Sequence, residues 1–192
     1  MKIILASTSP RRRALMKEHR IPHVCVSPKA DEGAIMKSVK SKNPYAVANA
    51  IALAKAESVR GRFDKGLIIG SDTIVVLGSR IIGKPSSKKN AYTIISALSG
   101  SVHRVITSVA FIDAQTGKTL VTSETTKVHF SKISSEEILK YIKNNNVMDK
   151  AGAYAIQEGA DPYVKKIEGP RDNVVGFPMA LVKRIIKNWK KI

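Results

Sequence analysis

Cysteine, aromatic residues and long apolar runs are all scarce in this sequence. The one cysteine, Cys25, excludes an intrachain disulfide and a zinc site built from cysteines. Aromatic side chains make up 5% of the 192 residues, so aliphatic side chains must form the core. No apolar run approaches the ~18–20 residues that a membrane-spanning helix needs, and the apolar stretch 3–6 is too short for a signal-peptide core. We therefore expect a soluble, cytoplasmic protein without a membrane partner.

Acidic residues are also few. The chain has 15 Asp and Glu but 33 Lys and Arg, which gives a formal net charge of +18. Such a field attracts anions, whether nucleotides, nucleic acids or acidic surfaces, without distinguishing among them. Nucleic-acid-binding modules usually interleave basic patches with aromatic residues that stack on bases. Here no aromatic residue lies among the arginines, so we expect no specific nucleic-acid partner. A nucleic-acid-binding module without turnover remains the first alternative.

Strands and helices alternate along the first half of the chain, which predicts an α/β protein with a mixed sheet. Two helix starts carry a polar cap followed by proline, at Ser9-Pro10 and Asn43-Pro44. Apolar stretches predict strands over residues 3–6, 67–77, 102–113, 119–130, 151–156 and 163–167. The length and the lack of a flexible linker favour a single domain spanning residues 1–192.

The turn before the first helix is rich in hydroxyl and basic groups, from Ser7 to Arg12. Free N–H groups and the helix dipole favour an anion at a helix N-terminus. Arg11 and Arg12 oppose that dipole, and a phosphate bound to them would resolve the conflict. The segment suggests a phosphate site that includes Ser7, although it lacks the Gly-x-x-x-x-Gly-Lys pattern of a Walker loop. A capped surface helix with solvated arginines is the alternative.

Asp72 is the one acid between Asp64 and Asp113, and it interrupts the apolar stretch 67–77. A carboxylate among buried residues is costly unless it is paired, hydrogen-bonded or metal-bound. Asp72 could therefore hold a divalent metal ion or activate a water, or it could pair with a lysine as a structural group. Glu32, which precedes a glycine, is a candidate second metal carboxylate.

Two lysines, Lys55 and Lys84, lie on otherwise apolar elements. Each could neutralise phosphate or pair with Asp72, and a solvated lysine is the alternative. A further patch over residues 149–154 is rich in small side chains, which let a ligand approach the backbone closely. The nearby amide of Gln157 can both donate and accept, which suits the edge of a pyrimidine base.

Taken in order, these segments closely resemble the Maf family of nucleoside triphosphate pyrophosphatases, over nearly the whole chain. The matching segments are residues 5–12, 31–32, 55–56, 70–75, 83–85, 98–100 with His103, 149–157 and 173–178. One such segment would be weak support, but together they are highly specific. The Asp-Lys-Ala-Gly-Ala-Tyr form at 149–154, followed by Gln157, is similar to the branch that acts on dTTP and UTP rather than to the 7-methyl-GTP branch.

The resemblance implies an elongated, two-lobed α/β fold with a mixed twisted sheet, flanking helices and a central cleft, related to inosine triphosphate pyrophosphatases. It implies hydrolysis of the α–β phosphoanhydride of dTTP and UTP, or of modified pyrimidine nucleotides, to a monophosphate and pyrophosphate. It also implies a divalent metal cation, Mg²⁺ or Mn²⁺, and commonly a homodimer.

The resemblance also assigns roles to matching residues. Asp72 matches the catalytic carboxylate, and Glu32 with Asp72 matches the metal-holding acids. The residues that match the phosphate-handling set are Ser7, Arg11, Arg12, Lys55 and Lys84. Positions linked to substrate choice match Arg11, Thr73 and Gln157.

Three positions depart from the family pattern: Ser71 where alanine is usual, Glu158 where glycine is common, and Phe177 for a usual leucine. Glu158 adds a charge beside the base-recognition patch, and its carboxylate could accept from a cytosine or purine amine. A second alternative is a non-enzymatic regulator of cell division. Such a regulator would not need Asp72 and the cationic residues together.

Overall fold

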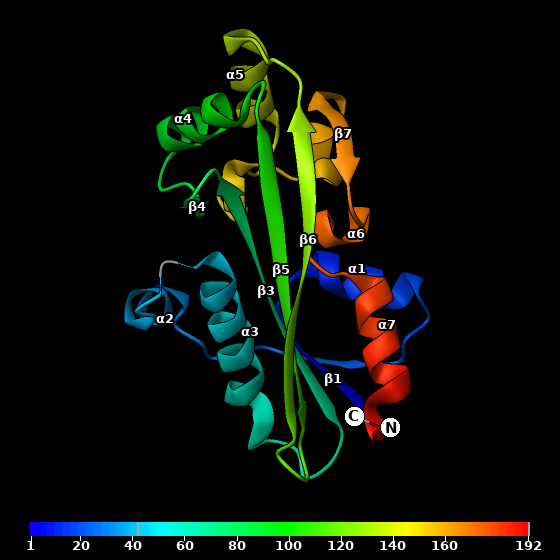
Figure 1. Ribbon diagram of the computed structural model, residues 1–192. Coiled ribbons are helices and arrows are strands. Elements are labelled where there is room, and N and C mark those ends of the chain that lie inside the picture. Colours follow the sequence, from blue (N-terminus) through cyan, green and yellow to red (C-terminus); the bar gives the residue numbers. More distant parts are fainter. Residues whose placement is uncertain (42, 192) are drawn as a thin grey trace. The chain divides into compact units, whose positions relative to one another are not determined.

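The computed structural model describes residues 1–41 and 43–191 (Figure 1). The strands are β1 (Ile3–Ala6), β2 (Val24–Val26), β3 (Leu67–Leu77), β4 (Arg80–Ile82), β5 (Val102–Asp113), β6 (Thr119–Phe130) and β7 (Val164–Glu168). The α-helices are α1 (Pro10–Glu18), α2 (Glu32–Ser38), α3 (Pro44–Arg60), α4 (Lys88–Leu98), α5 (Ser135–Asn144), α6 (Arg171–Val175) and α7 (Met179–Asn188). Short turns of other helix types are η1 (Ala151–Ala153), η2 (Ile156–Ala160), η3 (Asp161–Tyr163) and η4 (Trp189–Lys191).

The strands form one seven-stranded mixed sheet in the order β2-β1-β3-β5-β6-β7, with β4 paired to β3. This confirms the expected α/β class with a mixed sheet. The chain packs into two compact units. Unit 1 is Met1–Asp72, Thr107–Glu124 and Gly176–Ile192, and unit 2 is Thr73–Ile106 and Thr125–Val175. The division falls within β3, directly after Asp72, and also within β5 and β6.

In unit 1, β1 lies parallel to both of its neighbours. β1 pairs with β2 on one side and with β3 on the other, where Ala6 lies opposite Gly70. Small and aliphatic side chains from β1, β3, β5 and α3 form a core cluster, made of Ile4, Ala6, Ala52, Ala56, Val59, Ile68, Ala110 and Ile112. The alanine-rich face of α3 can therefore lie close against the sheet.

Unit 2 has an antiparallel sheet and a larger aliphatic and aromatic core. β3 and β4 form a hairpin, with Val75 opposite Ile82, and β7 pairs with the end of β6. Side chains of α4 and α5 pack on this sheet, including Ile95, Leu98, Ile138 and Ile142.

One predicted strand is wrong. Residues 151–156 form the turn η1 and the start of η2 rather than a strand. The cause is the backbone, because Gly152 (φ 73°) and Ala153 (φ 58°) both adopt the left-handed region, which a strand cannot contain. Two short helices, α2 and α6, were not predicted from the pattern. Within the described part of the chain, no helix is both long and apolar enough to cross a membrane.

Candidate active site

The turn between β1 and α1 is a hydrogen-bonded cap, as the Ser9-Pro10 pattern predicts. The Ser9 hydroxyl accepts from the Arg12 backbone N–H at 3.4 Å, and Pro10 occupies the first turn. Ser7 is buried, and its hydroxyl accepts from the Ser9 N–H at 3.1 Å. The turn is therefore fixed by its own hydroxyl groups, and Ser7 supports it from inside.

Arg12 lies beside the sheet rather than in solvent. Its Nε donates to the Gly176 carbonyl and its Nη1 to the Ser71 carbonyl, each at 2.9 Å. Burial lowers the pKa of Arg12, whereas the Asp72 carboxylate favours the charged form. Arg12 thus brings a guanidinium close to Asp72, and it also ties α1 to β3. The alternative of a merely solvated arginine does not describe this residue.

Gly70 explains how α3 approaches β3 so closely. A Cβ at Gly70 would lie 2.3 Å from the Ala52 carbonyl oxygen and 2.7 Å from the Ala56 nitrogen, distances that no side chain tolerates. Because Gly70 has no side chain, the α3 backbone can pack directly on the strand. Lys55 on α3 is then brought next to Asp72, two residues beyond Gly70.

The Lys55 ammonium holds two carboxylates. Its Nζ donates to Asp72 Oδ1 at 2.7 Å and lies 2.8 Å from Glu32 Oε1. We call Lys55, Asp72 and Glu32 the Lys55 cluster. Lys55 and Asp72 are buried, while Glu32, at the first position of α2, is partly exposed. The pairing of Asp72 with a lysine, which the sequence offered as the structural alternative, is therefore present.

The two acids of this cluster are suitable donors for a hard divalent cation. Carboxylate oxygens are the ligands that Mg²⁺ prefers, and it is commonly held by one or two carboxylates together with substrate phosphates. Among residues 1–41 and 43–191, no three His, Cys, Asp or Glu side chains gather into a metal-binding group. Asp72 and Glu32 therefore fit a metal that the substrate helps to coordinate, and do not fit an all-protein site.

The remaining candidates belong to different units. Arg11 lies half-buried at the start of α1 in unit 1. Thr73 follows Asp72 along β3 and opens unit 2, where Lys84 is exposed between β4 and α4. Gln157 is exposed on η2 of unit 2. Unit 1 thus contains six of the candidates, namely Ser7, Arg11, Arg12, Glu32, Lys55 and Asp72.

A second lysine cluster lies in unit 2 and was not predicted. The Lys150 ammonium is buried, with Asp149 Oδ1 at 2.9 Å and Glu158 Oε2 at 2.8 Å, and it also donates to the Asn146 carbonyl. We call Lys150, Asp149 and Glu158 the Lys150 cluster. The sequence signal for this cluster is a lysine that lies between two acids in a segment of small apolar residues. A buried ammonium in such a segment needs charged or polar partners.

His103 is a further polar group in the core of unit 2. Its Nε2 lies 2.8 Å from the Tyr154 hydroxyl, and its ring packs edge-on against Phe130. Burial lowers the pKa of His103 to about 4, with His129 adding to the effect, and burial raises the pKa of Tyr154. His103 is therefore neutral near pH 7 and holds the tyrosine of the 149–154 motif in place.

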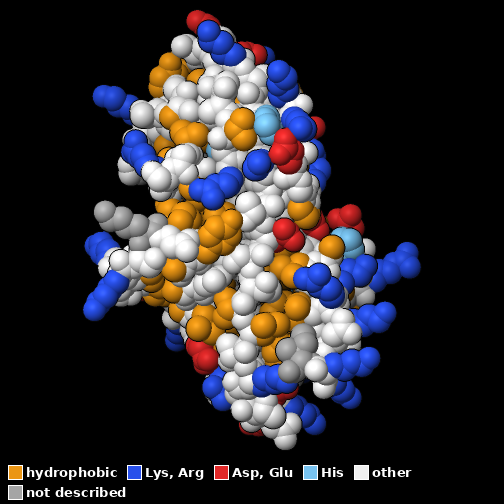
Figure 2. Space-filling model, viewed as in Figure 1, with side chains coloured by type: hydrophobic (Ala, Val, Ile, Leu, Met, Phe, Trp, Pro, Cys, Tyr) orange, Lys and Arg blue, Asp and Glu red, His pale blue; other side chains and the backbone are white. Residues whose placement is uncertain are grey.

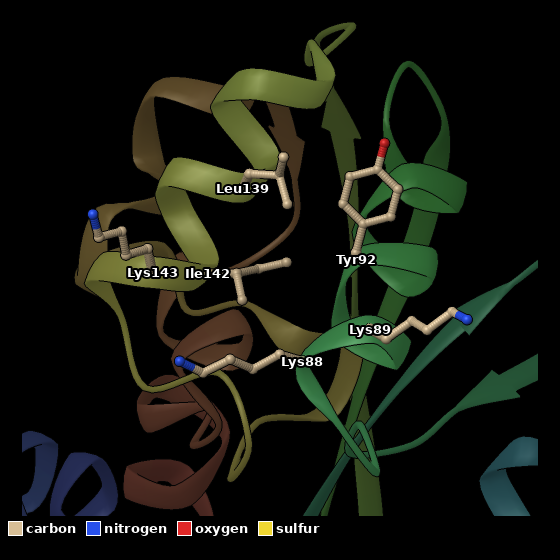
Figure 3. A pocket seen from close by; sticks show the side chains of 6 residues that line it. All are labelled: Lys88, Lys89, Tyr92, Leu139, Ile142 and Lys143. Atoms are coloured by element: carbon tan, nitrogen blue, oxygen red, sulfur yellow. The ribbon is translucent and has the colours of Figure 1, made fainter.

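An apolar hollow of about 460 Å³ lies on unit 2 between α4 and α5 (Figure 3). Its floor is Tyr92, Leu139 and Ile142, and its rim carries Lys88, Lys89 and Lys143. None of the residues of the Maf-like segments lines it. Basic side chains are also spread widely over the face shown in Figure 2, so lysines alone do not mark a site. The hollow is therefore not the centre to which the motifs point.

Comparison with known proteins agrees with the fold and with these motifs. The solved structure of the Staphylococcus aureus Ham1 protein matches with a TM-score of 0.54, covering 98% of this chain and 99% of that chain at 12% identity. That likeness concerns the fold. The family model described as Maf-like protein matches residues 2–189, and the chain belongs to the Maf family.

Curated relatives match over almost their full length. A protein of Alkaliphilus oremlandii named dTTP/UTP pyrophosphatase is 42% identical over 97% of this chain and 95% of its own. One of Thermotoga maritima with the same name is 40% identical over 100% of this chain and 92% of its own.

Proposed function

We propose that this chain is a nucleoside triphosphate pyrophosphatase that hydrolyses the α–β phosphoanhydride of dTTP and UTP. The observation that carries the proposal is the Lys55 cluster, in which a buried acid on β3 is held beside a buried ammonium, 2.7 Å away. The names of the curated relatives support the same reaction and the same two substrates.

In this proposal Asp72 accepts a proton from the attacking water. The water oxygen bonds to the α-phosphorus, the bond from that phosphorus to the bridging oxygen breaks, and pyrophosphate leaves with the electron pair. The products are a nucleoside monophosphate and pyrophosphate. Lys55 holds the Asp72 carboxylate in one place through the 2.7 Å contact, which preorganises the base.

Cationic groups would offset the charge of the substrate. A triphosphate carries about four negative charges, so attack by water on it needs positive groups nearby. Arg11 and the Ser7 turn lie at the N-terminus of α1, where backbone N–H groups also favour phosphate. Arg12 adds a guanidinium whose position is fixed by two carbonyls. In unit 2, we assign Lys84 to phosphate binding from the family resemblance.

The proposal includes a divalent cation, Mg²⁺ or Mn²⁺, held by Asp72 and Glu32. When bound, it would supply positive charge to the phosphate oxygens. We also assign base choice to Arg11, Thr73 and Gln157, and expect a cytoplasmic homodimer. Light scattering on the purified protein tests the dimer.

One panel of assays tests the proposed function. Each of dTTP, UTP, CTP, ATP and GTP is incubated with Mg²⁺ or Mn²⁺, and pyrophosphate and monophosphate are measured together. We expect both products in equal amounts, fastest from dTTP and UTP. Release of inorganic phosphate alone would contradict cleavage at the α–β bond. Salt-sensitive binding to DNA with no turnover would favour the nucleic-acid-binding alternative.

A further inference from the structure

The segment from Lys150 to Ala160 has an unusual backbone within unit 2. Gly152 (φ 73°), Ala153 (φ 58°) and Gly159 (φ 82°) all lie in the left-handed region. A non-glycine residue such as Ala153 rarely adopts this conformation unless its surroundings impose it. Gln157 is exposed on this segment, between buried Ile156 and partly buried Glu158.

The Lys150 cluster joins the two ends of this segment. The Lys150 side chain is only 3% exposed, and its Nζ lies 2.8 Å from Glu158 Oε2. The same ammonium is tied to Asp149 and to the Asn146 carbonyl, ahead of the turn. Glu158, the residue directly after Gln157, is thus anchored to a buried group that cannot easily move.

We propose that Glu158, acting through Lys150, is a positioning residue that fixes the backbone of Gln157 and thereby sharpens the choice of base. The inference rests on the proposed function, since base choice by Gln157 is part of it. It also replaces the expectation that the Glu158 carboxylate reads a base amine directly, because that carboxylate is already bound to an ammonium.

The physical reason is preorganisation. An amide that must pair with both a ring N–H and a carbonyl tolerates little displacement, and a misplacement of about 1 Å can cost on the order of 10²-fold in rate. The part of the segment around Gln157 is held by main-chain bonds from the Glu158 and Ala160 N–H groups to the Ala155 carbonyl, at 3.0 and 3.3 Å. These amides report directly on whether the segment stays ordered.

The test compares Glu158→Gln with a matched control, Glu168→Gln. The two side chains are almost equally exposed, 37% and 38%, and both pair with lysines in unit 2, but the Lys166 partner of Glu168 is itself exposed. In Glu158→Gln, we expect the backbone amides of residue 158 and of Ala160 to exchange hydrogen at least about tenfold faster than in the wild type. The control should leave these amides unchanged.

Kinetics test the second half of the inference. Glu158→Gln should lower the UTP-to-GTP ratio of kcat/KM by about tenfold, mainly through a higher KM for UTP, because an interaction made equally in the ground and transition states is weakened. The same substitution in a Gln157→Ala background should change the ratio little, since the group that Glu158 positions is gone.

Each outcome decides a different point. Unchanged exchange at the two amides in Glu158→Gln overturns the positioning role. An equally large change of the ratio in the Gln157→Ala background also overturns it, because Glu158 would then act on the base without Gln157. A wild-type chain that hydrolyses no triphosphate refutes the proposed function and the effect on base choice, while hydrogen exchange still decides whether Glu158 orders the segment.

Discussion

Lys55 in unit 1 and Lys150 in unit 2 each hold two carboxylates, but the acids differ in their surroundings. Lys55 is paired with Asp72, whose side chain is 10% exposed, and with Glu32 at 39%. Lys150 is paired with two partly solvated acids, Asp149 at 52% and Glu158 at 37%. Water therefore screens the acids of the Lys150 cluster much more than Asp72.

The clusters also differ in what they connect. Lys55 joins three elements, α2, α3 and β3, whereas Lys150 ties together residues of one short stretch, from Asn146 to Glu158. A buried acid held by an ammonium from another element is a candidate for chemistry. A buried ammonium that gathers local acids and a carbonyl is suited to fixing a loop. The comparison therefore separates Asp72, which we propose as the reacting group, from Lys150, which we propose fixes a loop.

The largest effect is expected for Asp72→Asn, which removes the proposed general base while keeping the shape of its side chain. Loss of a general base typically costs about 10²- to 10⁴-fold, and we expect kcat for UTP to fall within this range. Asp64→Asn, an exposed acid of the same unit, is the control and should keep wild-type kcat. Near-normal turnover of a folded Asp72→Asn protein would remove Asp72 from the mechanism.

The two lysines should differ in stability when each is replaced by methionine. Lys55→Met leaves Asp72 buried without its ammonium, so the free energy of unfolding should fall by about 3–5 kcal/mol. Lys150→Met should cost less, about 1–3 kcal/mol, because the acids that lose their partner are partly solvated.

Lys166→Met provides the lower bound for this series. It breaks an exposed pair with Glu168 and should cost about 0–1 kcal/mol. Urea unfolding of the three variants measures the loss of unfolding free energy in each and so gives their order. If Lys150→Met destabilises as much as Lys55→Met, the exposure of the acids does not set the difference between the clusters.

Acid should weaken the protein in part through a buried histidine of unit 2, His103. The pKa of His103 is lowered from 6.5 to about 4 by burial, so the unfolded chain binds a proton in this range that the folded chain does not. The contribution of His103 to the free energy of unfolding should therefore fall as the pH drops from about 6.5 to about 4, by about 3 kcal/mol in total, and level off below.

The His103→Gln substitution keeps a polar partner for the Tyr154 hydroxyl, but the new side chain has no titratable group. Its unfolding free energy should lack this contribution between pH 4 and 6.5, so the difference between variant and wild type should change with pH by about 3 kcal/mol. Parallel pH profiles for the two proteins would show that His103 takes up its proton equally in both states.

The sequence predicted regular elements well where apolar runs and caps agree. The strands expected over 102–113 and 119–130 have those same bounds as β5 and β6, and the Asn43-Pro44 signal marks the start of α3. The stretch 151–156 was mistaken for a strand because its left-handed backbone depends on tertiary packing. A Cβ at Gly152, for example, would meet Val75 Cγ2 at 3.0 Å.

The candidate site was predictable in part. Asp72 stood out as an isolated acid in an apolar stretch, but whether a lysine would reach it was left open. The answer depends on Gly70, whose missing side chain lets α3 approach β3, and this is a contact between distant parts of the chain. The Lys150 cluster was missed for a different reason. Its signal, a lysine between acids in a segment of small side chains, does not by itself show that the Lys150 side chain turns inward.

The smallest effect concerns Ser71, which lies beside Asp72 where the family usually has alanine. Ser71 is fully buried, and its hydroxyl has no hydrogen-bond partner among the described residues. A buried polar group without a partner costs about 1–3 kcal/mol, so Ser71→Ala should raise the free energy of unfolding, by about 1 kcal/mol once the lost packing is included. The backbone carbonyl that accepts from Arg12 is kept, so kcat should not fall.

Ser58→Ala, in the same unit, is the matched control. It should lower the free energy of unfolding, because the Ser58 hydroxyl donates to the Lys55 carbonyl at 2.9 Å. A loss of stability in Ser71→Ala, measured by urea unfolding, would mean that the hydroxyl is stabilised beside the Lys55 cluster, and that this departure from the family pattern contributes to holding Asp72.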